Sequence, residues 1–221
     1  MSATSPTRTL DYDFVRGTDT GATSTVAVLL HGRGSDKHDL LGIRSLLPAD
    51  WSLVTPRAPF AGAPWGYGPG YAWYRYVEED RVVTDTLVES LGLLDEFLSG
   101  LSKAVGFEPG RIVIGGFSQG GTMSLAYAIT RPGSVAAALN FSGFLAAWID
   151  LDETGAAPPI TPLFWGHGTG DPAIPIALAE RGRSRLRRAG ARMVARDYRI
   201  GHWIAEEEVA EAVAMVGSLN G

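Results

Sequence analysis

The sequence predicts an α/β fold in which helices cover both faces of a mostly parallel central sheet. Short apolar runs rich in β-branched residues alternate along the chain with longer runs whose apolar residues recur every three or four positions. Strands that alternate with helices in this way build parallel sheets. No internal repeat, long linker or break in composition appears in the 221 residues. We therefore expect a single domain over residues 1–221.

The predicted strands are short apolar segments of the kind that fill the interior of a sheet. A weaker segment, residues 9–15, alternates apolar and polar positions and predicts a first strand at the edge. The interior strands are predicted over residues 25–30, 51–55, 111–114, 136–141, 162–165 and 191–198.

The clearest predicted helix contains five apolar residues that share one face through steps of three or four. These residues are Val83, Leu87, Leu91, Leu94 and Leu98. Further helices are predicted over residues 121–129, 176–189 and 204–219. Residues 58–76 combine Trp and Tyr with Gly and Pro without a period, which predicts an irregular loop. Such a loop either shapes a ligand site or packs its aromatic rings on the body of the domain.

The composition excludes several classes of function. The net charge of −5 argues against a nucleic-acid partner, because such proteins carry a basic face. The absence of Cys excludes disulfides, thiolate metal ligands and a Cys nucleophile. No segment approaches the roughly 18 apolar residues of a membrane span, so no stable membrane insertion is expected. The first ten residues show no apolar secretory segment, and we expect a cytoplasmic protein.

The most informative segment is Gly116-Phe-Ser-Gln-Gly120, which fits the pattern G-x-S-x-G. A predicted strand leads into it and a predicted helix follows it, which is the setting of a nucleophile elbow. The sharp turn lifts the hydroxyl of Ser118 clear of the sheet. Gly116 and Gly120 then lie too close to neighbouring backbone to carry a side chain. Ser118 is the candidate nucleophile, and an idle serine in a glycine-rich turn is the alternative.

The candidate base and acid follow from chain order, because an elbow serine is followed by Asp or Glu and then His. Of the four histidines, His202 lies between the last predicted strand and helix, whereas His167 precedes the best acid. That acid is Asp171, in the loop after the strand at 162–165, where open α/β sheets place working groups. The weaker candidate acids are Asp150, Asp152, Glu153 and Asp197.

Two backbone N–H groups are candidates for binding the substrate's oxyanion. One belongs to Gln119, directly after the nucleophile, and the other to Arg33, in the glycine-rich loop His31-Gly-Arg-Gly-Ser-Asp36. His31 and Asp36 are then expected to be structural. A metal site built from His31, Asp36, His38 and Asp39 is the rival interpretation of this loop, but it has no spaced partner elsewhere in the chain.

These segments resemble the phospholipase/carboxylesterase family, which includes acyl-protein thioesterases and small bacterial carboxylesterases. The resemblance rests on Leu29-Leu-His-Gly-Arg-Gly-Ser-Asp36, Gly115-Gly-Phe-Ser-Gln-Gly-Gly121, His167-Gly-Thr-Gly-Asp171 and Gly201-His202. It implies a minimal α/β-hydrolase fold, no metal or organic cofactor, and hydrolysis of carboxylic esters or thioesters. Members of the family are often dimers, so a homodimer is open. Trp203 departs from the pattern, because many relatives have an acidic residue there.

We expect a serine carboxylesterase for small-molecule esters of short to medium chain length. Residues 142–161, between two predicted strands, are too few for a cap domain, so the site should be open. The candidate pocket walls are Trp65, Trp73, Leu145 and Trp148. The alternatives are a lysophospholipase or acyl-protein thioesterase for long chains, a hydrolase of carbon–carbon bonds, and a non-catalytic binding protein on the same fold.

Eight arginines crowd the region after Asp171. They are expected to form a solvated face, with attraction of anionic substrates or lipid surfaces as the alternative. They are Arg181, Arg183, Arg185, Arg187, Arg188, Arg192, Arg196 and Arg199.

Overall fold

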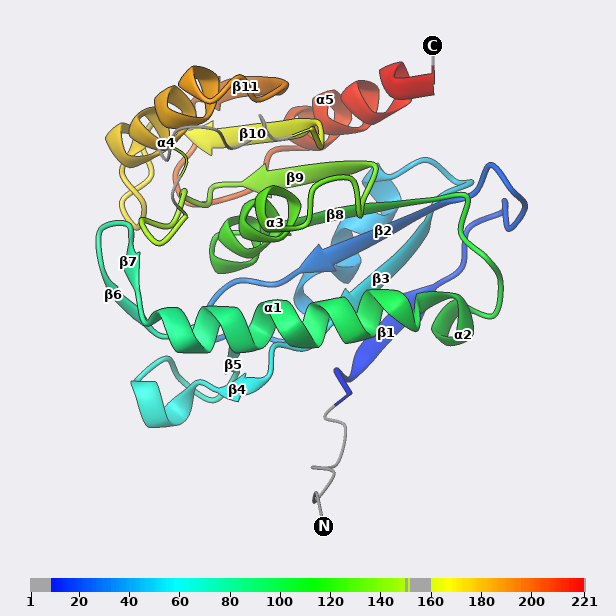
Figure 1. Ribbon diagram of the computed structural model, residues 1–221, viewed down its shortest axis with the longest axis horizontal. Helices are drawn as coiled ribbons and strands as arrows, with labels where there is room; N and C mark the ends of the chain where they lie inside the picture. Colours follow the sequence, from blue (N-terminus) through cyan, green and yellow to red (C-terminus); the bar gives the residue numbers. More distant parts are fainter. Residues whose placement is uncertain (1–8, 150, 152–159, 221) are drawn as a thin grey trace.

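The computed structural model describes residues 9–149, 151 and 160–220, and its centre is a seven-stranded sheet (Figure 1). The strand order is β1-β3-β2-β8-β9-β10-β11. Only β1 is antiparallel to its neighbour, and the other pairs are parallel. The strands are β1 (Tyr12–Val15), β2 (Thr25–Leu30), β3 (Ser52–Pro56), β8 (Arg111–Phe117), β9 (Ala137–Phe141), β10 (Leu163–Gly168) and β11 (Met193–Tyr198).

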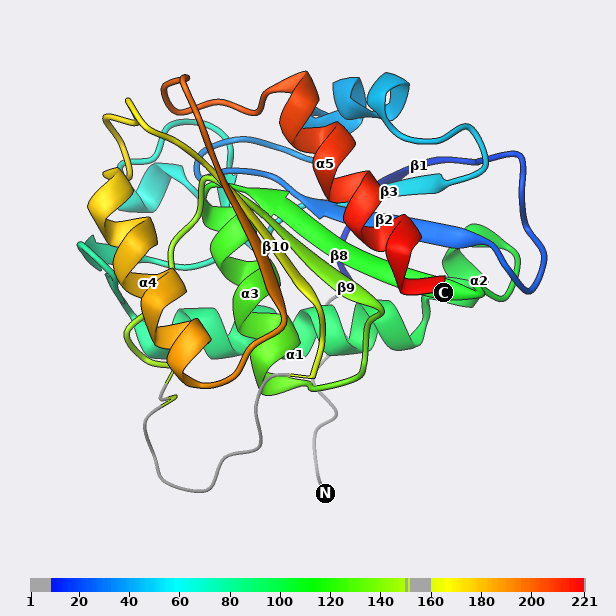
Figure 2. The same ribbon diagram turned by 90° about the horizontal axis from the view of Figure 1, so that it is seen from above.

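Helices cover both faces of this sheet, as the view from above shows (Figure 2). One face carries α1 (Thr84–Ser99), α3 (Gln119–Thr130) and α4 (Ile176–Arg188), with the short α2 (Leu101–Val105) following α1. The other face carries α5 (Glu206–Gly217) and the 3-10 helix η1 (Asp39–Leu46). A last 3-10 helix, η3, spans Ser218–Asn220. Among the described residues, no helix has the length and apolar character needed to cross a bilayer.

The core consists of two apolar layers, one on each side of the sheet, because successive strand residues point to opposite faces. In β2, Val26 and Val28 belong to the layer under α1, α3 and α4. Ala27 and Leu29, which alternate with them, belong to the layer under α5 and η1. A parallel sheet covered on both faces needs apolar residues at consecutive positions, and β2 is buried along its whole length.

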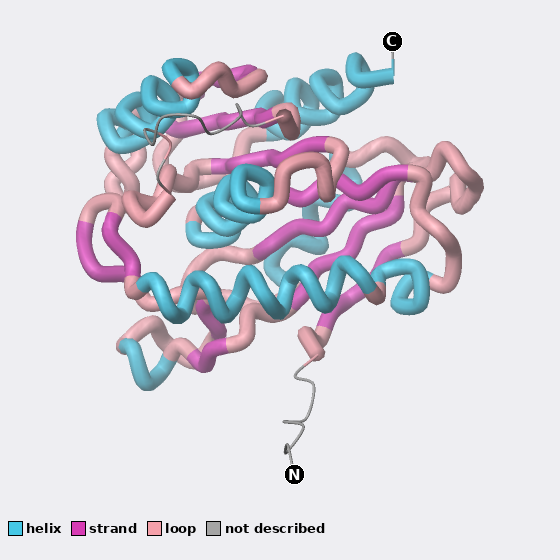
Figure 3. Tube along the Cα trace, in the orientation of Figure 1, coloured by secondary structure: helices cyan, strands magenta, loops and turns pink. Residues whose placement is uncertain are grey.

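The segment 58–76 is more ordered than the irregular loop that its composition predicts (Figure 3). It contains the antiparallel pair β4 (Phe60–Ala61) and β5 (Tyr71–Ala72), with the 3-10 helix η2 (Ala63–Trp65) between them. A second small hairpin follows, formed by β6 (Tyr76–Glu78) and β7 (Arg81–Val82). These pairs of two or three residues are too short for a periodic pattern to reveal.

Candidate active site

Ser118 occupies a sharp turn between β8 and α3. Its backbone has φ 54° and ψ −111°, a conformation that is costly for a residue with a Cβ atom. A Cβ added at Gly120 would lie 1.9 Å from the carbonyl oxygen of Leu30, and one at Gly116 would lie 2.5 Å from the same atom. The turn therefore needs glycine at both positions, as the sequence predicts.

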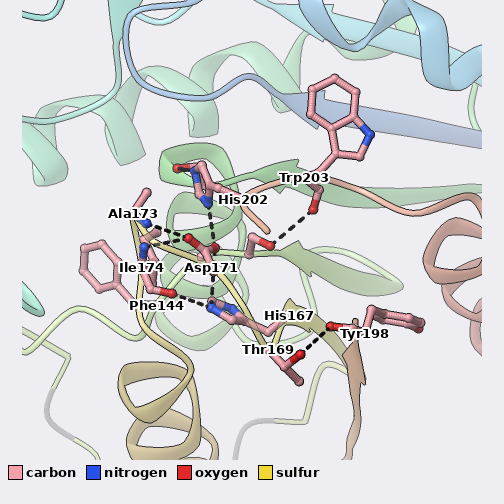
Figure 4. Close-up of polar contacts among 12 residues, drawn as sticks. Phe144, His167, Thr169, Asp171, Ala173, Ile174, Tyr198, His202 and Trp203 are labelled. Atoms are coloured by element: carbon pink, nitrogen blue, oxygen red, sulfur yellow. Dashed lines mark hydrogen bonds and ion pairs between the residues drawn. The ribbon is translucent and has the colours of Figure 1, made fainter. Parts of the chain in front are cut away.

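The structure brings Ser118, His202 and Asp171 together in one chain of hydrogen bonds. The distance from Ser118 Oγ to His202 Nε2 is 2.9 Å, and that from His202 Nδ1 to Asp171 Oδ2 is 2.7 Å. The other carboxylate oxygen of Asp171, Oδ1, accepts the backbone N–H groups of Ala173 at 2.8 Å and Ile174 at 2.9 Å (Figure 4). With Nδ1–H donating to the buried carboxylate, Nε2 is free to accept the proton of the serine hydroxyl.

Three separate strands supply these side chains. Ser118 follows β8, Asp171 follows β10 and His202 follows β11. Because all three strands are parallel, their carboxyl ends meet at one edge of the sheet. The fold thus unites residues that lie far apart in the sequence.

The two residues predicted to supply backbone donors, Arg33 and Gln119, line the same cavity as Ser118. Gln119 is the first residue of α3, so its N–H has no acceptor within the helix. Arg33 lies in the loop after β2, which is tied to β5: Gly34 N donates to Tyr71 O at 2.8 Å and Tyr71 N donates to Ser35 O at 2.7 Å. This pairing fixes the backbone around Arg33 before any substrate binds.

The side chain of Gln119 has a role that the sequence did not suggest. It is almost fully buried, its Oε1 accepts the N–H of Trp73 at 2.7 Å, and its Nε2 donates to the carbonyl of Tyr74 at 2.7 Å. The Gln119 side chain therefore joins the aromatic segment, residues 58–76, to the turn at Ser118 through two hydrogen bonds. One feature of the sequence could have indicated this role: Gln119 is a long polar residue in a turn whose other residues are small or apolar.

His31 and His167 are buried, and neither is in hydrogen-bond contact with Ser118. Burial lowers the pKa of both rings. His31 Nδ1 donates to Gly32 O at 2.7 Å, while its Nε2 accepts the N–H of Ala58 at 3.0 Å. His167 Nε2 donates to the carbonyl of Ile174 at 2.8 Å. Both rings are therefore neutral parts of the scaffold in this structure.

The structure does not support the rival metal site in the loop after β2, because three of its four side chains have other partners. Both ring nitrogens of His31 are occupied by backbone groups. Asp36 accepts two hydrogen bonds from Arg57, at 2.7 and 3.0 Å, and His38 contacts Asp13. Over residues 9–149, 151 and 160–220, no group of three or more His, Cys, Asp or Glu side chains could hold a metal ion.

The weaker candidate acids do not compete with Asp171 in the described part of the chain. Asp197 lies within β11 and forms an ion pair with Arg183, at 2.5 Å. Asp150, Asp152 and Glu153 lie outside the described residues.

A cavity of about 620 Å³ opens above Ser118 and His202. Much of its wall is aromatic or aliphatic, and the main apolar contributors are Tyr74, Tyr76, Phe117, Phe144, Ile174 and Leu178. Charged side chains also line it, among them Glu79 and Arg181, whose Oε2 and Nη2 atoms are 3.0 Å apart. The cavity therefore offers both apolar surface and charged groups to a bound molecule.

None of the four predicted wall residues lines this cavity, so that prediction is wrong. The ring of Trp65 packs on Phe60, with centroids 4.9 Å apart, and is not among the residues that line the cavity. Trp73 and Leu145 point into the protein core, and Trp148 is partly exposed elsewhere. Neighbouring side chains of a non-helical segment point in different directions, so the walls come from the adjacent Tyr74 and Phe144 instead.

Most of the arginine cluster is exposed to solvent, as expected, with Arg183 as the exception. The exposed members are Arg181, Arg187, Arg188, Arg192, Arg196 and Arg199. Arg183 is buried and donates to the carbonyls of Trp165 and Arg196, both at 2.9 Å. Arg181 lines the cavity. The cluster therefore combines surface charges with one structural residue.

Comparison with known proteins identifies the family of this chain. Residues 11–218 match the model of the phospholipase/carboxylesterase family. Acyl-protein thioesterase 1 of Cryptococcus neoformans is 30% identical over 72% of this chain and 71% of its own length. Lysophospholipase-like protein 1 of Mus musculus is 30% identical over 77% of this chain and 76% of its own.

Solved structures show the same fold. The crystal structure of esterase PE8 superposes with a TM-score of 0.79 at 26% identity, and the match covers 96% of this chain and all (100%) of that one. The chain belongs to the phospholipase/carboxylesterase family and is a carboxylic ester hydrolase with the α/β-hydrolase fold.

Proposed function

We propose that this chain is a serine carboxylesterase that hydrolyses short- to medium-chain esters through a Ser118–His202–Asp171 triad. The observation that carries the proposal is the unbroken hydrogen-bond chain from Asp171 through His202 to Ser118, beneath a cavity lined by apolar side chains. A nucleophile, a base within hydrogen-bond reach and a group that orients the base are the requirements of nucleophilic catalysis.

In the first half of the reaction, His202 Nε2 takes the proton of Ser118 as Oγ attacks the acyl carbonyl. The carboxylate of Asp171 keeps the proton on Nδ1 and stabilises the imidazolium that forms. The negative charge moves to the former carbonyl oxygen, where the N–H groups of Arg33 and Gln119 would bind it. When the intermediate collapses, His202 gives its proton to the leaving alcohol or thiol, and the acyl group stays on Ser118.

In the second half, water takes the place of the leaving group. His202 removes a proton from the water, the oxygen attacks the acyl-enzyme, and the bond to Ser118 Oγ breaks as the serine recovers its proton. The carboxylic acid then leaves. Neither half requires a metal or an organic cofactor.

The choice of short to medium chains is supported by the cavity, whose volume of about 620 Å³ lies within the usual range for small-molecule sites. The second candidate is a thioesterase or lysophospholipase that acts on long acyl chains. It is favoured by the names of the relatives, an acyl-protein thioesterase and a lysophospholipase-like protein. Oxygen and sulfur esters share the same chemical steps at Ser118.

Labelling with a fluorophosphonate tests the catalytic proposal. We expect stoichiometric modification of Ser118, located by mass spectrometry of the digested protein, and none in Ser118→Ala. The variant should also lose at least about 10⁴-fold in kcat on p-nitrophenyl acetate while its circular dichroism spectrum is unchanged. An unlabelled wild-type protein without esterase activity would support the binding-protein alternative.

Substrate range is tested with p-nitrophenyl esters and matching thioesters whose acyl groups run from two to sixteen carbons. A maximum of kcat/KM at the short or medium chains is the expected result. A maximum at the longest chains would favour the thioesterase or lysophospholipase candidate. Turnover of diketones but not of esters would indicate a hydrolase of carbon–carbon bonds.

A further inference from the structure

We propose that His167 is a positioning residue for the triad: its Nε2–H holds the Ile174 carbonyl and thereby fixes the turn whose amides orient the Asp171 carboxylate. This inference rests on the proposed function. It assigns a task to a buried histidine that takes no part in the transfer of protons described above.

His167 lies next to Asp171, the acid of the triad, on the side away from solvent. It is the penultimate residue of β10, and its side chain is fully buried. Its Nε2 atom lies 2.8 Å from the Ile174 carbonyl oxygen and 3.7 Å from Asp171 Oδ2 (Figure 4). The first distance is a hydrogen bond, whereas the second is a weaker electrostatic contact.

Ile174 links this histidine to the carboxylate. Its carbonyl accepts the hydrogen bond of His167, and its own N–H donates to Asp171 Oδ1 at 2.9 Å. The N–H of Ala173 donates to the same oxygen at 2.8 Å, so two successive amides hold Oδ1. Oδ2 is then directed at His202 Nδ1, at 2.7 Å. A displaced Ile174 carbonyl would carry the adjoining amides with it and turn the carboxylate away from His202.

The protonation of His167 suits this task. Burial keeps the ring neutral, so it carries one N–H, and the Ile174 carbonyl requires that proton on Nε2. Nδ1 is then an acceptor, and in the described structure it is buried without a hydrogen-bond partner. An apolar ring would fill the same space without an unpaired nitrogen, so packing alone does not account for an imidazole here. The hydrogen bond from Nε2–H to the Ile174 carbonyl accounts for it.

Three charged or titratable groups act on His167: Asp171, Arg183 and His202. The negative charge of Asp171 opposes the other two, and none of them replaces the hydrogen bond to Ile174. The test must therefore separate loss of the donor from loss of the ring and from a change in charge.

Replacement by Gln and by Asn provides a matched pair of variants. The side-chain nitrogen of Gln is as many bonds from Cα as His Nε2, whereas the nitrogen of Asn is one bond closer. We expect His167→Gln to keep most of the activity and His167→Asn to lose about tenfold to 10²-fold in kcat on p-nitrophenyl acetate, the cost of a small misplacement. His167→Phe, which keeps a ring but has no donor, should lose as much as Asn.

The division of the loss between kcat and KM distinguishes positioning from general loosening. A misplaced carboxylate weakens an interaction that is made in the transition state and leaves the binding of the ester unchanged. The loss in His167→Asn and His167→Phe should therefore fall on kcat with KM unchanged, and both constants should stay close to wild type in His167→Gln. Circular dichroism and thermal unfolding identify any variant that does not fold, and the Asn and Phe variants, which are both expected to lose the hydrogen bond to Ile174, serve as alternates for each other.

Two results would overturn the inference. The first is wild-type kcat, or a loss that falls on KM alone, in a folded Asn or Phe variant. The second is an equal loss in all three variants, which would assign His167 to packing alone. Both leave the wild-type labelling of Ser118 intact, so they differ from failure of the proposed function, in which the wild-type protein neither reacts with the fluorophosphonate nor hydrolyses esters.

Discussion

The loops after β2 and β10 flank Ser118 and are built in opposite ways. In the loop after β2, side chains hold the backbone: His31 accepts the N–H of Ala58, and Asp36 is paired with Arg57. In the loop after β10, the backbone holds a side chain, because two amides grip the carboxylate of Asp171.

The difference matches what each loop would contribute to the reaction. A backbone N–H cannot rotate by itself, so a loop that supplies one must be rigid along its chain. A carboxylate can rotate, so a loop that supplies one must restrain its torsion. The two buried histidines show the same contrast. Both ring nitrogens of His31 are bonded to backbone, while His167 uses only the nitrogen that faces the turn after Asp171.

Asp171→Asn should produce the largest loss, about 10⁴-fold in kcat, because an amide that donates to Nδ1 would hold His202 in the wrong tautomer. Steady-state kinetics on p-nitrophenyl acetate measures it. The fold should be retained, since Asn can still accept the N–H groups of Ala173 and Ile174. Activity within tenfold of wild type would mean that the β10 loop does not supply the orienting acid.

Gly34→Ala tests the loop after β2 and should lower kcat by about 10²–10³, the usual cost of one oxyanion donor. Gly34 has φ 77°, and an added Cβ would lie 2.3 Å from the carbonyl oxygen of Tyr67, so the loop must shift and take the Arg33 amide with it. The matched control is Arg33→Ala, which keeps that amide and should change kcat little. A larger loss in the control than in Gly34→Ala would place the function in the arginine side chain instead.

Glu208→Gln should have the smallest effect on turnover and a clear effect on stability against pH. Glu208, in α5, is fully buried and packs against Gly166 of β10, and burial raises its pKa to about 8 from the ordinary 4.5. Between these values the folded protein holds a proton that the unfolded chain releases. The free energy of unfolding should therefore fall as pH rises from about 4.5 to about 8.

The Gln variant lacks this proton, so its stability should depend less on pH, and its advantage over wild type should grow up to about pH 8. Urea unfolding followed by circular dichroism across this range measures the two slopes. Equal slopes would contradict an uncharged Glu208 in the folded state.

The sequence predicted the sheet and the triad because both leave short-range signals. The elbow combines a strand, a G-x-S-x-G turn and a helix within a few residues, and chain order then selects Asp171 and His202. The ends of β8 and β10 were predicted too early, since glycines suggest turns. In the structure Gly115 and Gly166 belong to the ladder, paired with Leu139 and Phe141. Gly166 is required there because Glu208 packs directly on it.

The pocket walls could not be predicted in the same way. Whether Trp73 or Tyr74 faces the cavity depends on contacts with residues distant in the sequence. The two hydrogen bonds between the Gln119 side chain and the backbone of this segment are the clearest of these contacts. Similarly, η1 and the β6–β7 hairpin are present in the structure but were not predicted from periodicity, and local propensity is a weak guide to such short elements. Aromatic composition identified the segment but not the direction of its rings.

The backbone of Ser118 has a consequence for how this protein can evolve. A left-handed conformation is easy for glycine and costs other residues about 1–3 kcal/mol, so the serine makes the folded chain less stable than glycine would at the same place. Selection for stability alone would favour glycine at position 118, and only selection for turnover retains the serine. In relatives that no longer hydrolyse esters, we therefore expect Ser118 to be among the first site residues to be replaced, because its loss makes the fold more stable.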